Sequence, residues 1–305
     1  MPLYSFKLKV LFTSILFLIL FSPTVIHGRQ EYTAQNKDLT IICDDTLAPA
    51  TKKIITLYPV IRDELEKLLG WEVDFRPTIV LIKDNETFIK MSGHQLIVAY
   101  ALPEQELIVM DYSKMRIDPF SIKSIIKHEL CHLLLHKKIK RNNLPLWLDE
   151  GVAQWVSGGL ADIIMNDHRI LDTAILSNQY IPLHRIEYQF PRENKLLTLA
   201  YAESKSLVEY IAHEFGTKGI LDLLRYLHKD YNIDSAVYES FSISFDEFEK
   251  RWYKSLKKEA TWITFVINNL YSILFFIASL LLIYGFIKIL LKKRAYREMD
   301  EWDND

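Results

Sequence analysis

Two histidines lie four residues apart, with a glutamate between them, in the segment His128-Glu129-Leu130-Cys131-His132. On an α-helix, side chains at positions i and i+4 leave the same face about 6 Å apart, so both imidazoles can bind one Zn²⁺ ion at about 2.0 to 2.1 Å. Glu129 lies about 100° around the same helix, beside the metal rather than on it. It can therefore accept a proton from a zinc-bound water, whose pKa the ion lowers toward about 7. The pattern predicts a hydrolytic zinc site with Glu129 as its base.

A third ligand is expected from the segment Trp147-Leu148-Asp149-Glu150-Gly151, which the sequence places on the next helix. A tetrahedral catalytic zinc site needs three protein ligands and one open position for water. Glu150 is the natural candidate for the third ligand. Asp149 has two interpretations: it can accept the second ring N–H of a ligand histidine, or it can be an acid that the helix dipole favours near a helix start.

The segment that carries the histidines has the pattern of a buried helix. Asp118-Pro119 resembles an N-cap followed by proline at the first helical position. An apolar stripe follows at helical spacing, formed by Ile122, Ile125, Ile126, Leu130 and Leu133. The alternative is that His128 and His132 are core histidines without a metal, but two buried histidines beside a buried glutamate are unfavourable unless a metal binds them. The helix is therefore predicted to present a metal site from within the core.

These motifs resemble those of the gluzincin metallopeptidases, in particular the small bacterial peptidase MA-like group. The resemblance rests on the zinc motif at residues 128–132 and on Leu-Pro-Leu-Trp-Leu-Asp-Glu-Gly-Val-Ala at residues 144–153, and it spans about residues 121–258. Weaker likenesses lie in three later segments, which are residues 200–204, residues 210–216, and residues 241–249 with Trp252 after them.

The resemblance implies a Zn²⁺ cofactor held by His128, His132 and Glu150. It also implies that Glu129 acts as general base and acid. Related gluzincin aminopeptidases carry a Gly-x-Met-Glu-Asn segment that grips the free amino terminus of the substrate, and no such segment precedes His128. Endopeptidase action on a peptide or protein is therefore favoured over aminopeptidase action. The alternative from another class is a non-catalytic, membrane-anchored binding or assembly protein that retains the gluzincin scaffold, but the ligands and the base are all present.

A peptidase must also stabilise the oxyanion that forms when water attacks the peptide carbonyl. Zinc provides part of this stabilisation, and a Tyr, His or Arg donor commonly provides the rest. We expect Tyr201 to be this catalytic donor, because it opens a helix downstream of the ligands in a segment that resembles the family. A tyrosine that only packs between helices is the alternative. His184, Arg185 and Arg192, on the intervening loop-like stretch, are weaker candidates.

The amino-terminal end has the outline of a signal peptide. Lys7 and Lys9 precede an apolar run at residues 10–21, and a short polar stretch continues to residue 28. The apolar run is too short to span a bilayer comfortably. Ile26 is not the small residue expected three positions before a cut after residue 28, so an uncleaved signal anchor is the alternative.

A second apolar segment lies near the other end. Residues 262–287 contain no charge, and at about 1.5 Å per residue a helix of this length can cross a hydrocarbon layer of about 30 Å with some tilt. A basic cluster follows, formed by Lys288, Lys292, Lys293, Arg294 and Arg297. The positive-inside rule predicts a cytoplasmic tail after the span, and it also keeps the charged end of the leader in the cytoplasm.

Both signals place the central part of the chain outside the cytoplasm. We expect a cell-membrane protein, single-pass after removal of the leader, whose catalytic domain is extracytoplasmic. With a net charge of −2, the expected partners are a peptide or protein substrate and the lipid bilayer, with no nucleic acid; the oligomeric state is left open. The predicted divisions are a signal peptide or anchor at residues 1–28, a peptidase domain at 29–261, a transmembrane helix at 262–290 and a cytoplasmic tail at 291–305.

The order of the predicted elements favours an α+β fold, because strands come first and the catalytic helices follow. Besides the zinc helix, strands are predicted at residues 39–43, 77–82, 95–101 and 106–112, and helices at residues 47–69, 85–91, 146–156, 199–215, 218–228 and 245–257. This order predicts a zincin-like catalytic domain with a small sheet packed on the active-site helix, a mostly helical C-terminal lobe and one C-terminal transmembrane helix. The pair of strands at residues 95–112 is a candidate edge for binding an extended peptide, with a covered structural strand as the alternative.

Two cysteines add little to the functional interpretation. Cys131 lies within the zinc motif, so a disulfide would require the segment around Cys43 to pass close to the zinc helix. Acting as a fourth zinc ligand, Cys131 would close the open position that catalysis needs. A small buried thiol that helps to pack the helix is the favoured interpretation.

Overall fold

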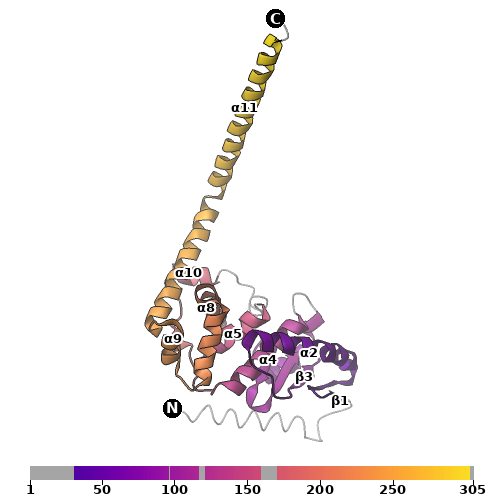
Figure 1. Cartoon of the computed structure of the whole chain (residues 1–305). Coiled ribbons are helices and arrows are strands. Elements are labelled where there is room, and N and C mark those ends of the chain that lie inside the picture. The colour runs from indigo at the N-terminus through magenta and orange to yellow at the C-terminus, as the bar shows by residue number, and fades with distance from the viewer. Residues whose placement is uncertain (1–30, 96, 117–120, 159–169, 303–305) are drawn as a thin grey trace.

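The computed structural model describes residues 31–95, 97–116, 121–158 and 170–302. The predicted signal peptide and the Asp118-Pro119 pair lie outside these residues. One long helix, α11 (Leu270–Trp302), extends away from the folded domain that the preceding residues form (Figure 1).

A five-stranded sheet forms the amino-terminal part of the domain, in the order β1-β2-β3-β5-β4. Its strands are β1 (Glu31–Gln35), β2 (Thr40–Asp44), β3 (Thr78–Ile82), β4 (Ala99–Leu102) and β5 (Leu107–Asp111). β2, β3 and β5 pair in parallel, whereas β1 and β4 pair antiparallel at the two edges. The central strands are runs of apolar residues because both faces of the sheet are covered.

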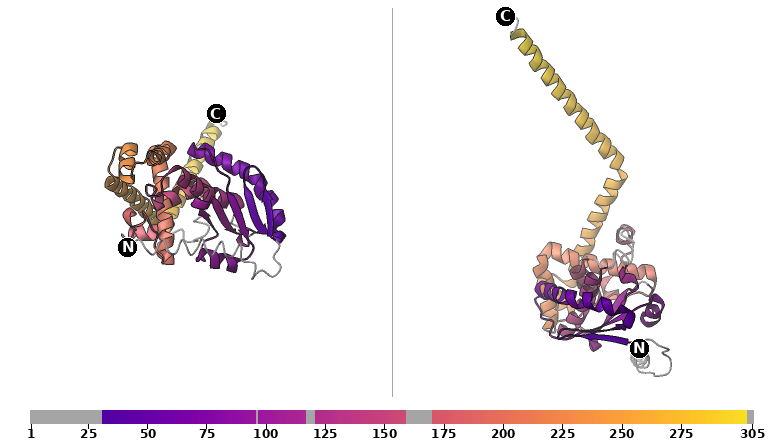
Figure 2. Two further views of the ribbon diagram at one scale, coloured as in Figure 1. Left: turned by 90° about the horizontal axis from the view of Figure 1, so that it is seen from below. Right: turned by 90° about the vertical axis from the view of Figure 1, so that its right-hand side faces the viewer.

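Helices on the two faces of the sheet bury alternate side chains of each strand. These helices are α2 (Ala48–Leu69), α3 (Asn85–Ser92) and α4 (Ile122–Lys138). Successive side chains of a strand point to opposite faces. On β3, Ile79 and Leu81 therefore join the main core with α2 and α4, whereas Val80 and Ile82 pack in a smaller cluster with Phe88 of α3. The two views of Figure 2 show the helices packed on this sheet.

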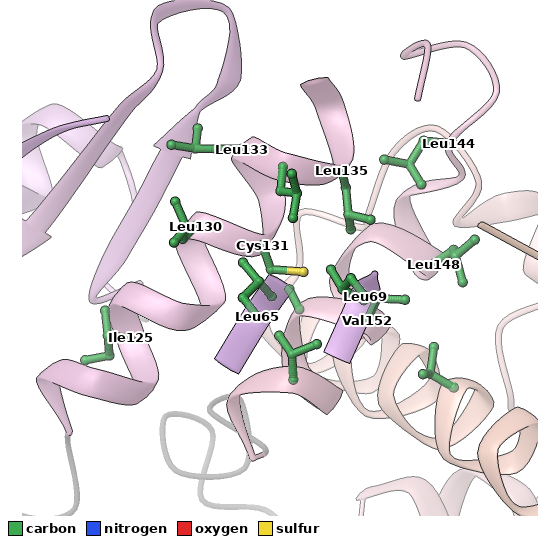
Figure 3. Packing of buried hydrophobic residues seen from close by; sticks show 14 of the residues in the cluster. Leu65, Leu69, Ile125, Leu130, Cys131, Leu133, Leu135, Leu144, Leu148 and Val152 are labelled. Carbon is green, nitrogen blue, oxygen red and sulfur yellow. The ribbon is translucent and has the colours of Figure 1, made fainter. Parts of the chain in front are cut away.

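The predicted zinc motif lies on α4. Ser121 caps this helix, because its side chain accepts a hydrogen bond from the backbone N–H of Ser124. Buried positions run around most of α4 rather than along one stripe, since the helix has the sheet on one side and α5 (Leu146–Ser157) on the other. Figure 3 shows this layer, with Cys131 of α4 and Val152 of α5 among the labelled residues. The motif therefore lies inside the core, as its sequence predicts.

The carboxy-terminal part of the domain is helical. Its helices are α5, α7 (Ile170–Leu176), α8 (Asn194–His228), α9 (Ile233–Phe241) and α10 (Phe245–Asn268). α5 packs against both α4 and α8, so it joins the two parts of the domain. α8 is interrupted at Gly216, whose φ of 70° and ψ of 175° are not helical. Trp252 anchors α10 to α8, because its buried ring N–H donates to Ser206 Oγ at 3.2 Å.

One apolar stretch, Leu270–Leu290 on α11, is long and apolar enough to cross a membrane, with a mean hydropathy of 2.5. None of this stretch is buried against the rest of the described chain. The helix is interrupted at Asn269, between α10 and α11. The uncharged run predicted at residues 262–287 is therefore divided, and its first seven residues belong to the end of α10. Two consecutive asparagines, which are poor helix formers, lie at this break.

The structure confirms the α+β fold class, with a small sheet on the zinc helix, a mostly helical second part and one apolar C-terminal helix. Some predicted elements have different limits, among them the helix predicted to end at residue 257, which runs to Asn268 as α10, and other elements were missed. β1 was not predicted, because its alternating pattern offers only two apolar side chains, Tyr32 and Ala34, both only half-buried, and the strand is held by its pairing with β2. The strand predicted to start at residue 95 begins at Ala99, and the helix predicted from residue 199 begins at Asn194. The short helices α7 and α9 were also not predicted.

Candidate metal centre

Three predicted ligands meet at the contact between α4 and α5. His128 and His132 are buried on one face of α4, with 7% and 8% of their surface exposed. Their Nε2 atoms are 3.2 Å apart. Glu150 of α5 completes the group, because its Oε2 atom lies 3.7 Å from each Nε2 atom. Two neighbouring helices thus bring three donor atoms to one point.

The second ring nitrogen of each histidine has an oxygen partner. His132 Nδ1 lies 2.8 Å from Asp149 Oδ1, and a carboxylate can only accept, so Nδ1 is the donor. His128 Nδ1 lies 3.4 Å from Ser157 Oγ, whose own hydroxyl donates to the backbone oxygen of Gln154. Both Nδ1 atoms are therefore assigned as protonated, which leaves both Nε2 lone pairs directed toward Glu150. Asp149 therefore accepts the second ring N–H of His132, which is the first of its two predicted roles.

The spacing of the three donor atoms fits a tetrahedral zinc ion. With metal–ligand distances of about 2.0 to 2.1 Å, tetrahedral geometry separates two ligand atoms by about 3.3 Å. The observed separations are 3.2, 3.7 and 3.7 Å. Two imidazole lone pairs and one carboxylate oxygen repel each other at this distance unless a cation lies between them. The donor set, two nitrogens and one oxygen, is also one that zinc accepts in catalytic sites.

Carboxylates set the charge balance around His132. Burial lowers the pKa of His132, but Asp149 and Glu150 outweigh this effect and raise that pKa to about 10. Burial raises the pKa of Asp149, but His132 and His136 lower it by more, so that carboxyl group stays below its usual range. The surroundings of the His132 ring therefore favour a positive charge, which a metal ion can supply in place of a proton.

Glu129, the predicted base, is buried on α4, with 4% of its surface exposed. Burial raises the pKa of its carboxyl group, and the charges of His128 and His132 oppose that rise. The carboxyl group thus lies within electrostatic reach of both histidines. This is the placement that the sequence pattern predicts for a residue beside the metal rather than on it.

Tyr201 of α8 reaches the same centre from a third helix. Burial, followed by the charges of Glu150 and Glu129, raises the pKa of its hydroxyl group well above the usual value, so this hydroxyl lies within electrostatic reach of both carboxylates. Two contacts hold the residue in place. Gln154 Nε2 donates to the backbone oxygen of Tyr201 at 3.0 Å, and the ring of Phe190 packs edge-on, with ring centroids 5.1 Å apart.

The weaker candidates for an oxyanion donor lie elsewhere. His184, Arg185 and Arg192 are exposed, and within the described part of the chain none of them contacts the three ligands. His136 was missed by the sequence reasoning, although its Nε2 atom lies 2.8 Å from Asp149 Oδ2. A signal was present, because the four-residue spacing of His128 and His132 repeats once more at His136.

Both cysteines are free and buried, as the sequence favoured. Burial raises the pKa of the Cys131 thiol well above its usual value, so this thiol is not a ready nucleophile or metal ligand. Cys131 lies in the main core with Leu65 and Leu69 of α2 (Figure 3). Its role in the described structure is packing.

A helix that carries His-Glu-x-x-His on a small mixed sheet, with a glutamate from the next helix beside both histidines, defines a metallopeptidase-like protein of the zincin class. Residues 98–258, which are more than half of the chain, match the family model of the Peptidase MA superfamily. The chain belongs to this superfamily.

Solved structures give a more distant likeness. An M1 zinc metallopeptidase from Deinococcus radiodurans is 13% identical, with a TM-score of 0.45, and the match covers 75% of this chain and 51% of that one. Aminopeptidase A from Legionella pneumophila, in complex with aspartic acid, is 11% identical, with a TM-score of 0.44, and the match covers 74% of this chain and 28% of that one. The chain thus spans about half or less of the length of these proteins. A comparison with curated proteins gives no match.

Proposed function

We propose that this chain is a membrane-tethered zinc endopeptidase that hydrolyses a peptide or protein outside the cytoplasm. One observation carries the proposal: the Nε2 atoms of His128 and His132 and the Oε2 atom of Glu150 lie within 3.7 Å of one another, beside the buried carboxyl group of Glu129. Membership of the Peptidase MA superfamily supports metallopeptidase activity. Among the described residues, no observation favours a non-catalytic binding protein, because the ligand set and the base are both complete.

Each side chain of the centre has a separate role in the proposed reaction. His128, His132 and Glu150 would hold the zinc ion. When bound, that ion would polarise the scissile carbonyl and lower the pKa of a water molecule toward about 7. Glu129 accepts the proton that the attacking water loses and then delivers it to the nitrogen of the leaving amine.

Tyr201 is the proposed donor to the oxyanion. Its hydroxyl group lies within electrostatic reach of Glu150, so it is already near the centre before a substrate binds. Turned toward the substrate, the same hydroxyl donates to the carbonyl oxygen that gains negative charge in the transition state. This donor acts without a proton transfer, because burial and the nearby carboxylates raise the pKa of Tyr201 and keep the hydroxyl protonated.

The substrate is proposed to bind along β4. This strand pairs with β5 on one side only and ends the sheet, so its outer edge can pair with an extended peptide. β4 also packs against α4, which carries the zinc motif. A peptide that adds to this edge runs past the metal centre and places an internal bond there, which favours endopeptidase action.

A cleavage assay tests this function directly. Full-length protein in detergent is incubated with a library of peptides blocked at both ends, and the products are mapped by mass spectrometry. We expect internal cleavage by the wild-type protein and none by Glu129→Gln. Cleavage of unblocked peptides alone, one residue at a time from the amino end, would overturn the endopeptidase proposal. Bound zinc without any cleavage would favour the non-catalytic binding protein.

The apolar stretch of α11 supports the membrane tether. Its orientation is proposed from the leader-like residues 1–28 and from the basic residues that follow the stretch, which are Lys292, Lys293, Arg294 and Arg297. Basic residues also precede the stretch on α10, namely Lys250, Arg251, Lys254, Lys257 and Lys258, so the leader is the stronger of the two signals. Protease treatment of intact cells tests the topology. We expect digestion of the domain and protection of a tag at the carboxy terminus, and the reverse pattern would overturn the proposed orientation.

A further inference from the structure

A second histidine shares the carboxylate that holds His132. Asp149 is buried, with 5% of its surface exposed. Its Oδ1 atom lies 2.8 Å from His132 Nδ1, and its Oδ2 atom lies 2.8 Å from His136 Nε2. His132 and His136 are four residues apart on α4, so both rings leave the same side of that helix and meet one carboxylate from α5.

This arrangement restrains the carboxylate more than a single hydrogen bond would. The terminal torsion of an aspartate is broad, so one donor leaves the plane of the carboxylate free to turn. Two donors on opposite oxygens define that plane. A buried carboxylate that loses one donor also loses a charge-assisted hydrogen bond, the stronger kind of hydrogen bond in proteins.

The position of Asp149 connects this restraint to the metal centre. Asp149 directly precedes Glu150, so the turn of α5 that supplies a ligand also supplies the partner of His132. If Asp149 turns, the Nδ1 atom of His132 loses its acceptor and the ring loses the contact that orients its Nε2 atom. His136 itself is not a ligand, because its Nε2 atom is directed to Asp149.

We propose that His136 is a positioning residue for the metal centre: it clamps Asp149, which in turn orients His132 toward the metal. This inference rests on the zinc site of the proposed function, and it adds a residue outside the ligands, the base and the oxyanion donor. Direct partners of metal ligands, such as Asp149, typically contribute about 10- to 100-fold to metal affinity, and His136 lies one contact further from the metal.

Zinc affinity of full-length protein in detergent, measured by competition with a chelator, tests the clamp without any substrate. We expect His136→Ala to weaken zinc binding, at most by the roughly 10- to 100-fold that is usual when a direct partner of a metal ligand is removed. His136→Gln should restore most of the loss, because the amide N–H₂ of glutamine lies near the place of histidine Nε2 and can donate to the same oxygen. The side chain of His136→Asn carries the same amide but is one carbon shorter, so the amide should not reach Asp149 and zinc binding should stay as weak as in His136→Ala. His213→Ala, which removes an exposed histidine of α8, is the matched control.

A double-mutant cycle separates a clamp from a merely structural role. If His136 acts through Asp149, its removal in an Asp149→Ala background should cause no further loss of zinc affinity. The Co²⁺-substituted protein should show an altered visible spectrum in His136→Ala and a restored one in His136→Gln. Independent, additive losses would overturn the proposal, as would wild-type affinity in His136→Ala. If the alanine variant does not fold, the difference between the glutamine and asparagine variants decides, and equal affinity in these two overturns it.

The outcome also separates this inference from the peptidase function. A wild-type protein that binds no zinc overturns both proposals. Zinc binding without peptide cleavage overturns only the peptidase function, and the affinity cycle still decides the role of His136.

Discussion

Gly151 of α5 and Ser204 of α8 lie at a close approach of two helices that carry residues of the proposed metal centre. A Cβ atom added at Gly151 would lie 2.3 Å from the backbone oxygen of Ser204 and 2.7 Å from a methyl group of Val208. Gly151 directly follows Glu150, the proposed third ligand, and Ser204 lies one turn beyond Tyr201. The absence of a side chain at Gly151 therefore lets α8 pack close to α5, on the turn next to Tyr201.

Gly151→Ala should destabilise the protein by about 1 to 3 kcal/mol, the usual range for overpacking a filled interior. The added methyl group meets a backbone oxygen, which cannot rotate away, so α8 must shift and carry Tyr201 with it. The midpoint temperature of thermal unfolding and the rate of peptide cleavage should both be lower in this variant than in the wild-type protein. Gly285→Ala is the matched control, because a Cβ atom there meets nothing within 4 Å. Equal stability of the two variants would contradict the proposed contact.

His128→Ala and Glu150→Ala should each lose bound zinc. Either change leaves two of the three protein ligands that a catalytic zinc site requires. Zinc content of the purified full-length protein, measured by inductively coupled plasma mass spectrometry, checks this expectation. His213→Ala should keep its zinc, since that side chain is exposed and pairs with Glu214. Full zinc retention in both ligand variants would remove the ligand assignments.

Glu129→Gln should keep the metal and lose turnover by about 10²- to 10⁴-fold, the usual contribution of a general acid–base residue. Glutamine has nearly the shape of glutamate but cannot take up the proton. Zinc content and the rate of peptide cleavage are measured on the same preparation. A variant that loses zinc together with activity would place Glu129 among the ligands instead.

Sequence patterns predicted those parts of the structure that are determined by residues close together in the chain. Spacing on one helix was enough to place His128 and His132 on one face, because helical geometry repeats every 3.6 residues. The helices predicted at residues 47–69 and 146–156 end close to their predicted limits, where Gly70 and Gly158 adopt left-handed conformations. β1 shows the limit, since its residues gain their structure only by pairing with β2.

Contacts between elements distant in the chain could not be predicted in the same way. The four-residue repeat of histidines places His136 on the same side of α4 as His132, but its partner, Asp149, comes from another helix, so the repeat alone could not predict their contact. The sheet order places β5 between β3 and β4, although β4 comes first in the chain. The close approach of α8 to α5 depends on Gly151, whose role appears only when the two helices are packed.

Tyr201→Phe should retain zinc and lose about 10²- to 10³-fold in turnover, the range found when one oxyanion donor is removed. The ring and its packing against Phe190 remain, so only the hydroxyl group is lost. Steady-state kinetics with a cleaved peptide should show the loss mainly in kcat. Tyr253→Phe is the control, because that hydroxyl bonds to Asn178 outside the metal centre. Unchanged kcat in Tyr201→Phe would leave the tyrosine a packing role only.

Glu203 of α8 is buried without a charged partner. Its surface is 0% exposed, its Oε1 atom accepts from the backbone N–H of Ile181 at 2.8 Å, and its Oε2 atom has no hydrogen-bond partner among the described residues. Burial raises the pKa of this carboxyl group to about 8, although the hydrogen bond from Ile181 opposes the rise. The folded protein thus holds a proton that the unfolded chain releases near pH 4.5, the ordinary pKa.

Glu203→Gln should flatten the dependence of stability on pH between about pH 4.5 and 8. Within this window the folded wild-type protein binds more protons than the unfolded chain, so its stability falls as the pH rises, by at most about 1.4 kcal/mol per pH unit. Below this window both states are protonated, and above it both are ionised, so the group adds no slope there. Glutamine cannot titrate, and the variant should therefore gain stability relative to wild type from pH 5 to pH 8. The midpoint temperature of thermal unfolding, measured across this pH range for both proteins, gives the difference. Glu239→Gln, which removes an exposed carboxylate, is the control. If stability depends on pH in the same way in Glu203→Gln and in the wild-type protein, Glu203 ionises at its ordinary pKa in the folded protein.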